Sequence, residues 1–236
     1  MKWWNRSWNP VTGCTKCSEG CDHCFAEALV EKRKKAEKSI SFDVRINQKQ
    51  LNKKINDDKE FIVVANQSDL FHPFVDEETL DRIFFRMDKD KSKRFAILTK
   101  RSAYMKDYFE NTENEHDFDR MIFGVTVETN KRKYRIDDLI GCEKIKNRFI
   151  CLEPLLEEVS ISEYLSTGKI DWVVVGCETG ENARECKIEW IEKIISECEQ
   201  YNVPIFVNNI NINGKIQDDL SGFKTIKREF YKIFKP

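Results

Sequence analysis

The sequence is poor in the residues that build flexible phosphate-binding loops. Only 9 of its 236 residues are glycine and 5 are proline, and neither G-x-G-x-x-G nor G-x-x-x-x-G-K-[ST] occurs. A doubly wound nucleotide-binding fold is therefore not expected. No apolar stretch approaches the roughly 20 residues that span a bilayer. The N-terminal segment also lacks the apolar core and cleavage site of a signal peptide. We expect a cytoplasmic protein without membrane contact.

An excess of charge of one sign is also missing. The chain has 40 Lys and Arg against 41 Asp and Glu, a net charge of −1, which argues against coating nucleic acid by charge alone and leaves a local basic groove open. Aromatic residues make up 11% and recur throughout, which excludes collagen, a coiled-coil rod and wholesale disorder. No repeat or linker divides the chain, so we expect a single domain over residues 1–236.

Apolar runs rich in β-branched residues alternate with charged, helix-like segments. The expected strands are Phe61–Ala65, Phe95–Leu98, Met121–Val127, Arg148–Leu152, Trp172–Val175 and Pro204–Val207. The expected helices are Ala26–Glu37, Asp76–Asp88, Ser102–Phe109, Lys131–Leu139, Ile161–Leu165 and Glu189–Gln200. Continuous hydrophobicity favours strands buried on both faces, as in a parallel sheet. The pattern predicts an α/β fold, a partial or irregular (β/α) barrel with mostly parallel strands and its chemistry at their carboxyl ends.

Cysteine, by contrast, is plentiful. There are nine, an odd number that fits a disulfide framework poorly, and four of them (Cys14, Cys17, Cys21 and Cys24) lie in the segment 9–25. Zinc prefers two cysteine pairs that are further apart, whereas an iron–sulfur cluster accepts several thiolates from one compact loop. An iron–sulfur cluster is the favoured interpretation, with zinc and free thiols as alternatives. Four other cysteines, Cys142, Cys151, Cys186 and Cys198, are expected to be small core residues without a metal role.

The pattern C-x3-C-x2-C formed by Cys17, Cys21 and Cys24, followed by Phe25, resembles the signature of the radical SAM superfamily. The resemblance implies that three thiolates hold a [4Fe–4S] cluster and that the fourth iron binds the amino and carboxylate groups of S-adenosylmethionine (SAM). Reduction by one electron then yields a 5′-deoxyadenosyl radical. It also implies a TIM-barrel-like fold of the radical SAM type and an external one-electron reductant.

A wider set of motifs resembles a phage-associated three-cysteine family, the phage protein 37/68 family, a radical-SAM-like domain of unknown function. The motifs are Trp8-Asn-Pro-Val-Thr-Gly-Cys14, Gly20-Cys-Asp-His-Cys24-Phe-Ala-Glu27, Ser68-Asp-Leu-Phe-His-Pro73, Leu98-Thr-Lys-Arg101, Phe123-Gly-Val-Thr-Val-Glu128, Leu152-Glu-Pro-Leu-Leu156 and Asp171-Trp-Val-Val-Val-Gly176. In this family the three cysteines match Cys14, Cys21 and Cys24, so Cys17 is the rival of Cys14 as third ligand. We favour Cys14, because the surrounding motif fixes its place.

Polar residues at the predicted strand ends are candidates for cofactor binding. They are Asn66, Ser68, Asp69, Thr126, Glu128, Glu153 and Glu178. Ser68 and Asp69 stand where radical SAM enzymes often carry Gly-Gly-Glu, and both accept hydrogen bonds from an ammonium. For Ser68 and Asp69 a turn or a helix cap is the alternative, and for Glu128 an ion pair with Lys131 or Arg132.

Candidate catalytic residues are Lys100, Arg101 and Glu153. The two adjacent cations at a strand end could hold a phosphate or carboxylate, with a solvated loop as the alternative. Arg184 is a weaker candidate of the same kind. The charged run 31–38 is expected to be a solvated helix face, and Trp3, Trp4 and Trp8 are expected to cover the cluster side of the barrel rather than to stack on bases.

These observations predict a radical SAM enzyme that abstracts hydrogen from a substrate. The phage association suggests a nucleotide or a nucleic acid. Because 236 residues leave little room for a second domain, either a large substrate docks on an open barrel face or a partner protein completes the site. The segment of about 208–236 is expected to be a C-terminal cap. The alternative function is a non-catalytic iron–sulfur or zinc protein that acts as an accessory or a nucleic-acid-binding module.

Overall fold

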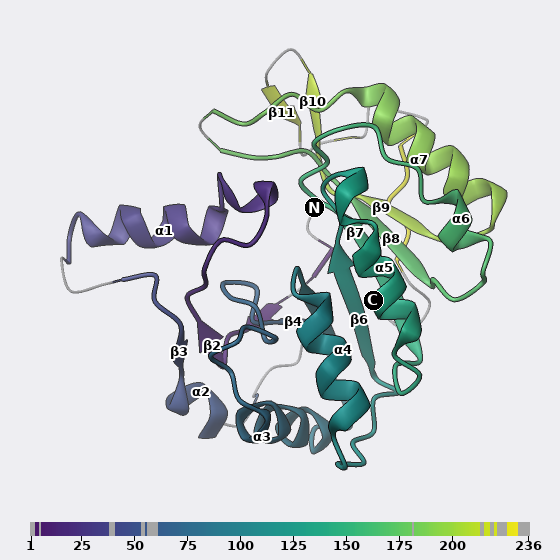
Figure 1. Ribbon diagram of the computed structural model, residues 1–236. Helices are drawn as coiled ribbons and strands as arrows, with labels where there is room; N and C mark the ends of the chain where they lie inside the picture. The colour runs from purple at the N-terminus through teal and green to yellow at the C-terminus, as the bar shows by residue number, and fades with distance from the viewer. Residues whose placement is uncertain are drawn as a thin grey trace.

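The core of the protein is a curled sheet of seven parallel strands with helices along its outside (Figure 1). The computed structural model describes residues 3–4, 6–37, 41–52, 55, 61–180, 182–212, 215–217, 220 and 226–230. The strands of the sheet are β1 (Arg6–Trp8), β4 (Phe61–Val64), β5 (Arg94–Thr99), β6 (Met121–Thr126), β7 (Asn147–Leu152), β8 (Trp172–Val175) and β9 (Ile205–Val207). Their order in the sheet, β1-β4-β5-β6-β7-β8-β9, follows the chain without reversal. A sheet wound in one direction is a partial barrel and not a doubly wound fold, which confirms the predicted fold class.

All six predicted strands exist, within a residue or two of their expected ends. The helices that follow them are α3 (Glu77–Asp88), α4 (Ser102–Asn111), α5 (Tyr134–Gly141), α6 (Ser162–Leu165) and α7 (Ile188–Gln200), and α1 is Phe25–Lys34. The Asp76 carboxylate caps α3 by accepting from the Thr79 amide at 2.9 Å. Short elements without a clear periodic signal were missed, namely β1, β2 (Val11–Thr12), β3 (Arg45–Ile46), α2 (Gln48–Asn52), β10 (Ile210–Ile212), β11 (Lys215–Gln217) and the 3-10 turn η1 (Glu19–Cys21). The 3-10 turn η2 (Asn130–Arg132) overlaps the start of the helix that was predicted over Lys131–Leu139.

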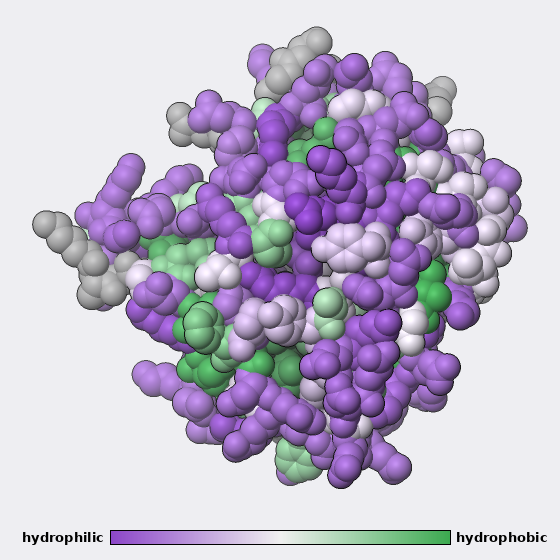
Figure 2. All heavy atoms as spheres, in the orientation of Figure 1, coloured by the Kyte–Doolittle hydropathy of each residue, from purple (hydrophilic) through white to green (hydrophobic). Residues whose placement is uncertain are grey.

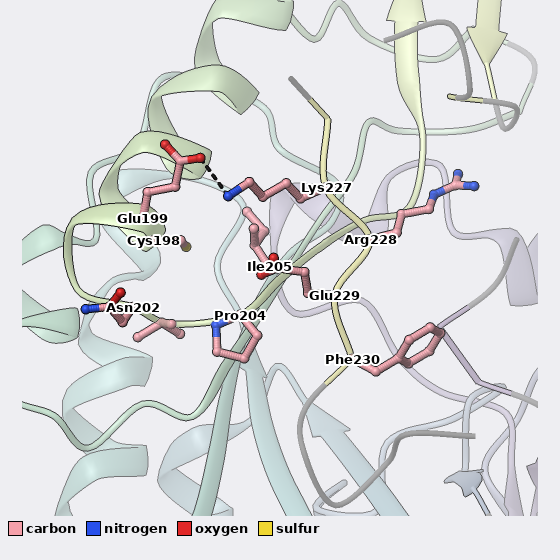
Figure 3. Close-up of a pocket in the computed structure, with 10 residues that line it drawn as sticks. Cys198, Glu199, Asn202, Pro204, Ile205, Lys227, Arg228, Glu229 and Phe230 are labelled. Atoms are coloured by element: carbon pink, nitrogen blue, oxygen red, sulfur yellow. Dashed lines mark ion pairs between the residues drawn. The ribbon is translucent and has the colours of Figure 1, made fainter. Parts of the chain in front are cut away.

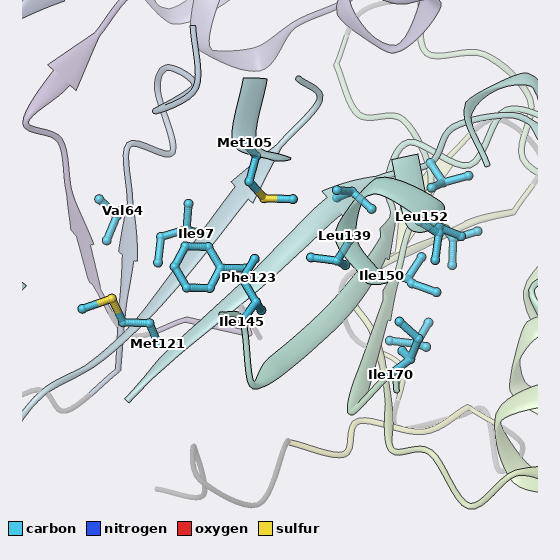
Figure 4. Packing of buried hydrophobic residues seen from close by; sticks show 14 of the residues in the cluster. Val64, Ile97, Met105, Met121, Phe123, Leu139, Ile145, Ile150, Leu152 and Ile170 are labelled. Atoms are coloured by element: carbon cyan, nitrogen blue, oxygen red, sulfur yellow. The ribbon is translucent and has the colours of Figure 1, made fainter. Parts of the chain in front are cut away.

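The larger hydrophobic core fills the space between the sheet and its helices (Figure 4). On β6, Met121, Phe123 and Val125 point into this core, while Ile122 points to the inner face of the curled sheet. All six residues of β6 are buried, as expected for a strand covered on both faces. The predicted core cysteines, Cys142, Cys151, Cys186 and Cys198, are buried as well.

A second core of mainly aromatic residues plugs the inside of the curled sheet. Trp3 packs against Trp172 and Phe149, with ring centroids 5.6 and 5.8 Å apart, and lies 6.2 Å from Phe61. Phe61 and Trp172 are the first residues of β4 and β8, so this plug closes the amino end of the barrel. The prediction that Trp3 covers the cluster side was therefore wrong. A chain that enters the sheet at Arg6 can reach only the end at which parallel strands begin.

Helix α1 extends from the body of the molecule, and Ala26 is its only buried residue (Figure 1). It ends at Lys34, three residues before the predicted end. Residues 31–37 are exposed, as predicted for a solvated face, and Lys38 lies outside the described residues. Much of the predicted C-terminal cap, including 221–225 and 231–236, also lies outside them.

A pocket lies where α7 leads into β9, close to the described C-terminal segment (Figure 3). It is lined by Cys198, Glu199, Asn202, Val203, Pro204, Ile205, Lys227, Arg228, Glu229 and Phe230. Because Ile205 begins β9, the pocket opens at the amino end of the sheet. In the part of the chain that the structure describes, no helix has the length and apolarity needed to cross a membrane.

Candidate functional site

Residues Cys14–Cys24, named the cysteine loop, connect β2 to α1. The loop begins after Gly13, whose φ of 77° and whose approach to Asp43 (an added Cβ would lie 2.0 Å from the carbonyl oxygen) exclude any side chain. The Cys14 amide donates to the carbonyl of Phe42 at 3.1 Å. Cys24 is the N-cap of α1. Both ends of the loop are thus held by regular structure.

The four thiols of the loop are free, and they are paired with different neighbours. The Arg101 Nη1 donates to Cys14 Sγ at 3.4 Å. A hydrogen bond from the Cys17 thiol lowers the pKa of Cys21 to about 4, and Ser18 Oγ lies 3.7 Å from the Cys21 sulfur. Cys17 is exposed, whereas the other three are half-buried. Among the described residues, no three His, Cys, Asp or Glu side chains converge in the geometry of a metal site.

The first anchor of the cysteine loop stands at the carboxyl ends of β4 and β5. Arg101 is buried, and its Nη2 donates to the Thr15 carbonyl at 2.7 Å and to Thr15 Oγ1 at 3.0 Å. The Asp69 carboxylate fixes Arg101 at 3.2 Å and also accepts from Thr99 Oγ1 at 2.6 Å. Ser68 donates to the Gly13 carbonyl. Asp69 and Ser68 therefore hold the backbone around the loop.

The second anchor follows β6. The fully buried Glu128 accepts from Ser18 Oγ at 2.5 Å and from Arg135 Nη1 at 2.8 Å, rather than pairing with Lys131 or Arg132. Gly20 is needed because an added Cβ would lie 2.4 Å from Glu128 Oε1. Glu19 accepts from Arg132 and from Thr129, and the Arg132 hydrogen bond is the main cause that lowers the pKa of Glu19 to about 2.

The third anchor follows β8. Glu178 accepts from His23 Nδ1 at 2.8 Å and from the Arg184 amide and Nε, both at 2.9 Å. Arg184 in turn donates to the Glu19 carbonyl at 2.8 Å and pairs with Asp22 at 3.3 Å. Burial alone would raise the pKa of Glu178, but hydrogen bonds from Arg184 and His23 outweigh it and lower the pKa to about 2. The cysteine loop is therefore tied across the carboxyl edge of the sheet from β4 to β8.

Below the loop, strand alternation points a layer of polar side chains into the barrel. Ala96, Ile122 and Cys151 belong to the inner core. Every second residue from them toward the carboxyl ends of the strands therefore also points into the barrel. The members of this inner polar layer are Lys100, Thr126, Glu153 and Asn208. Glu153 accepts from Asn208 Nδ2 at 2.7 Å and from Asn209 Nδ2 at 3.2 Å. The Thr126 hydroxyl is buried, with no hydrogen-bond partner in the described part of the chain.

Lys100 is the cation of this inner polar layer. Burial would lower the pKa of its ammonium, but the nearby Glu128, Cys21 and Cys151 raise it above the ordinary value. The Lys100 amide donates to Asp69 at 3.1 Å. Lys100 therefore stays charged and is the member of the inner polar layer that lies near Cys21 of the cysteine loop, whereas its neighbour Arg101 is committed to the loop.

The structure brings most of the sequence candidates together at one edge, but for two different tasks. Lys100, Thr126 and Glu153 face the barrel interior, and Asn66, two residues after β4, has a buried Oδ1 that is unpartnered within the described region. Ser68, Asp69, Arg101, Glu128 and Glu178 hold the loop or its supports. Sequence reasoning missed Arg135, although its partner Glu128 is only seven residues away, because it considered Lys131 and Arg132 instead. It also missed Thr15 and His23, whose partners lie far away: His23 and Glu178 are 155 residues apart. No local signal could have found these pairs.

Fold and site together define a parallel α/β half-barrel that carries a loop of four free cysteines across the carboxyl ends of its strands. Residues 1–220 match the family model described as "Protein of unknown function (DUF5131)", and the chain belongs to that family. The phage association stays a prediction.

A search of curated proteins returns no match. Among solved structures, a mutant of spore photoproduct lyase matches at a TM-score of 0.49 with 11% identity, over 85% of this chain and 75% of that one.

Proposed function

We propose that this protein is a radical SAM enzyme, with a [4Fe–4S] cluster on the cysteine loop and SAM between the cluster and the inner polar layer. The observation that carries the proposal is the three-point anchoring of four free thiols over the carboxyl edge of a parallel half-barrel. That edge is where parallel barrels place their chemistry. The anchors rest on carboxylates and a guanidinium and leave the thiols free to bind a metal.

The donor set suits an iron–sulfur cluster. Four thiols within eleven residues fit a compact cluster loop better than a zinc site with separated pairs. Lys100 and Arg101 lie close to Cys21 and Cys14 and offset the negative charge of thiolate ligands. We propose Cys14, Cys21 and Cys24 as the ligands, with Arg101 orienting Cys14. Cys17, the exposed thiol, remains the rival of Cys14.

The inner polar layer suits the amino acid part of SAM. Lys100 would pair with a carboxylate, and Glu153 would accept from an ammonium. Two buried oxygens, that of Thr126 at the end of β6 and that of Asn66 two residues after β4, have no hydrogen-bond partner among the residues described, and a ligand would supply one. When bound and reduced, the cluster and SAM supply a 5′-deoxyadenosyl radical. The protein's own part is to orient SAM and to keep water away.

The proposal extends to the surroundings of the enzyme. We propose a nucleotide or nucleic acid as the substrate, an external one-electron reductant, a cytoplasmic location, and either an open substrate face or a partner protein that completes the site. The exposure of Cys17 supports the proposed external reductant, because the donor would approach the loop from solvent.

One contact favours an alternative. The Cys17 thiol is hydrogen-bonded to Cys21, so all four cysteines could close around one metal centre. A closed cluster or a zinc site would have no open iron, and the protein would then be an accessory or a nucleic-acid-binding module rather than an enzyme.

The deciding experiment is anaerobic reconstitution with iron and sulfide, followed by reduction and EPR spectroscopy with and without SAM. We expect a reduced [4Fe–4S] signal that changes when SAM is added. The zinc content of the protein as purified distinguishes the alternative, a colourless zinc protein, from an iron–sulfur protein. A signal indifferent to SAM, or stoichiometric zinc without a cluster, would contradict the proposal.

A further inference from the structure

Four exposed aromatic side chains stand around the cysteine loop, and none is among the sequence candidates. Phe25, Phe74, Tyr104 and Tyr134, named the aromatic rim, are exposed by 49%, 77%, 51% and 49%. Exposed apolar side chains that gather at one place, unlike single ones, mark interaction sites. By contrast, Trp3 and Trp8, the aromatics that the sequence offered for base stacking, are buried.

The rim residues belong to the carboxyl edge of the sheet. Phe74 lies in the turn before α3, Tyr104 in the first turn of α4, and Tyr134 at the start of α5. Each of these segments follows a parallel strand, so all three leave the same edge. Phe25 begins α1, directly after Cys24.

Phe74 is linked to the loop by contacts. Its ring stacks on His72, with centroids 5.5 Å apart and planes 17° apart, and His72 Nε2 lies 2.8 Å from Thr15 Oγ1. Phe74 is therefore linked to the cysteine loop through His72 and Thr15. The space-filling view shows a hollow between α1 and α4, with hydrophobic and weakly polar surface around a hydrophilic floor (Figure 2).

The charges around the rim narrow the class of ligand. Arg101, Arg132 and Arg184 are committed to Asp69, Glu19 and Glu178. Lys131, exposed beside the rim, has no carboxylate partner among the residues described, and Lys100 lies in the floor. Because Lys100 is assigned to the carboxylate of SAM, Lys131 alone remains for the strand, and one cation matches a single phosphate rather than the dense phosphates of a duplex. Flat exposed rings, in turn, offer stacking to bases whatever their sequence.

We propose that the aromatic rim binds unpaired bases of a short single-stranded nucleic acid and delivers one of them to the hollow beside the cysteine loop. The inference rests on the proposed function in that this strand would be the enzyme's substrate. It adds that recognition comes from stacking rather than from phosphate contacts. Binding of single strands should therefore depend weakly on salt and exceed binding of duplexes.

The test is fluorescence anisotropy with a labelled 12-nucleotide DNA strand of mixed sequence and with its duplex, on the full chain as purified. We expect the single strand to bind more tightly than the duplex. Phe74→Ala and Tyr134→Ala should each weaken binding by about tenfold, the lower part of the range for one lost stacking partner. Phe74→Tyr should retain binding, because the ring remains.

Phe85 supplies the matched control. It is 53% exposed, but it lies on α3 with the Lys89 ammonium over its ring at 4.3 Å. Phe85→Ala should leave binding unchanged. Equal losses in Phe85→Ala and the rim variants, duplex binding as tight as single-strand binding, or affinity only for anionic lipid vesicles would overturn the inference. Because anisotropy needs no cluster, failure of the EPR test would overturn the proposed function and leave this result standing.

Discussion

Arg101 gives Cys14 a surrounding that differs from that of Cys17. Cys14 is half-buried and accepts a hydrogen bond from the Arg101 guanidinium, whereas Cys17 is exposed and donates a hydrogen bond to Cys21. We therefore expect Cys14→Ser to lose the cluster after reconstitution, and Cys17→Ser to keep about four irons per chain. Iron and sulfide analysis measures this directly.

The buried Cys142 offers a control, since Cys142→Ser should keep the full iron content. Retention in Cys14→Ser with loss in Cys17→Ser would assign the ligands to Cys17, Cys21 and Cys24. Loss in both variants would point to four thiolates and to a closed site.

Glu178 makes the stability of the protein depend on pH. Its pKa falls from 4.5 to about 2 on folding, so its stabilising effect is present above about pH 4.5 and is lost as the pH falls toward 2. Glu178→Gln should lower the free energy of unfolding by about 2 kcal/mol at pH 7. The difference from the parent should shrink at pH 3. Urea unfolding at both pH values measures it.

The exposed ion pair between Lys133 and Glu163 provides the comparison. Glu163 is 62% exposed, so Glu163→Gln should change the free energy of unfolding by less than about 1 kcal/mol at either pH. A Glu178→Gln effect that is equally small, or that does not vary with pH, would show that the carboxylate does not anchor the loop.

At the scale of elements, the close approach of β6 and β7 depends on one glycine. A Cβ on Gly124 would lie 2.3 Å from Phe149 Cε1 in the aromatic plug. Gly124→Ala should therefore lower the free energy of unfolding by about 1–3 kcal/mol through overpacking. Thermal unfolding followed by circular dichroism checks it.

Gly141, the last residue of α5, is the matched control. A Cβ there would meet the Lys106 Cε at 3.7 Å, an ordinary contact. Gly141→Ala should be neutral, or stabilising by less than about 1 kcal/mol, because alanine favours helix. A Gly124→Ala protein as stable as Gly141→Ala would mean that β6 and β7 can separate without cost.

At the scale of the whole molecule, the aromatic plug joins distant parts of the chain. Trp3 from the N-terminal segment touches β4, β7 and β8, and the Trp172 Nε1 donates to the Glu229 carbonyl at 2.8 Å near the C-terminal end. Trp3→Ala should lower the free energy of unfolding by about 3–5 kcal/mol, as for other large aromatic deletions in cores. Urea unfolding followed by circular dichroism measures the loss.

Trp190 on α7 is half-buried and has Lys187 over its ring at 5.7 Å. Trp190→Ala should therefore be much milder than Trp3→Ala. Equal losses would mean that the plug adds no more than an ordinary surface tryptophan.

The sequence alone determined the order of strands and helices and the place of the cysteine loop. The strands were predictable because both faces are buried and their apolar runs are continuous, and the Asp76 cap was predictable because a cap is a local interaction. The four cysteines were found because their spacing is local.

Only the tertiary structure decided which candidates anchor the loop and which face the barrel. The side chains that anchor the loop, Ser68, Asp69 and Glu178, carry hydroxyl and carboxylate groups, and so do Thr126 and Glu153, which face the barrel. Only the hydrogen-bond partners, up to 155 residues away in the chain, show which residue has which task. The same holds for the tryptophans. Hydrophobicity predicted that Trp3 is buried, but the parallel pairing of β1 with β4 put it at the end opposite the cysteine loop. Exposure of the aromatic rim likewise depends on where helices begin at the carboxyl edge, which is a property of the assembled sheet.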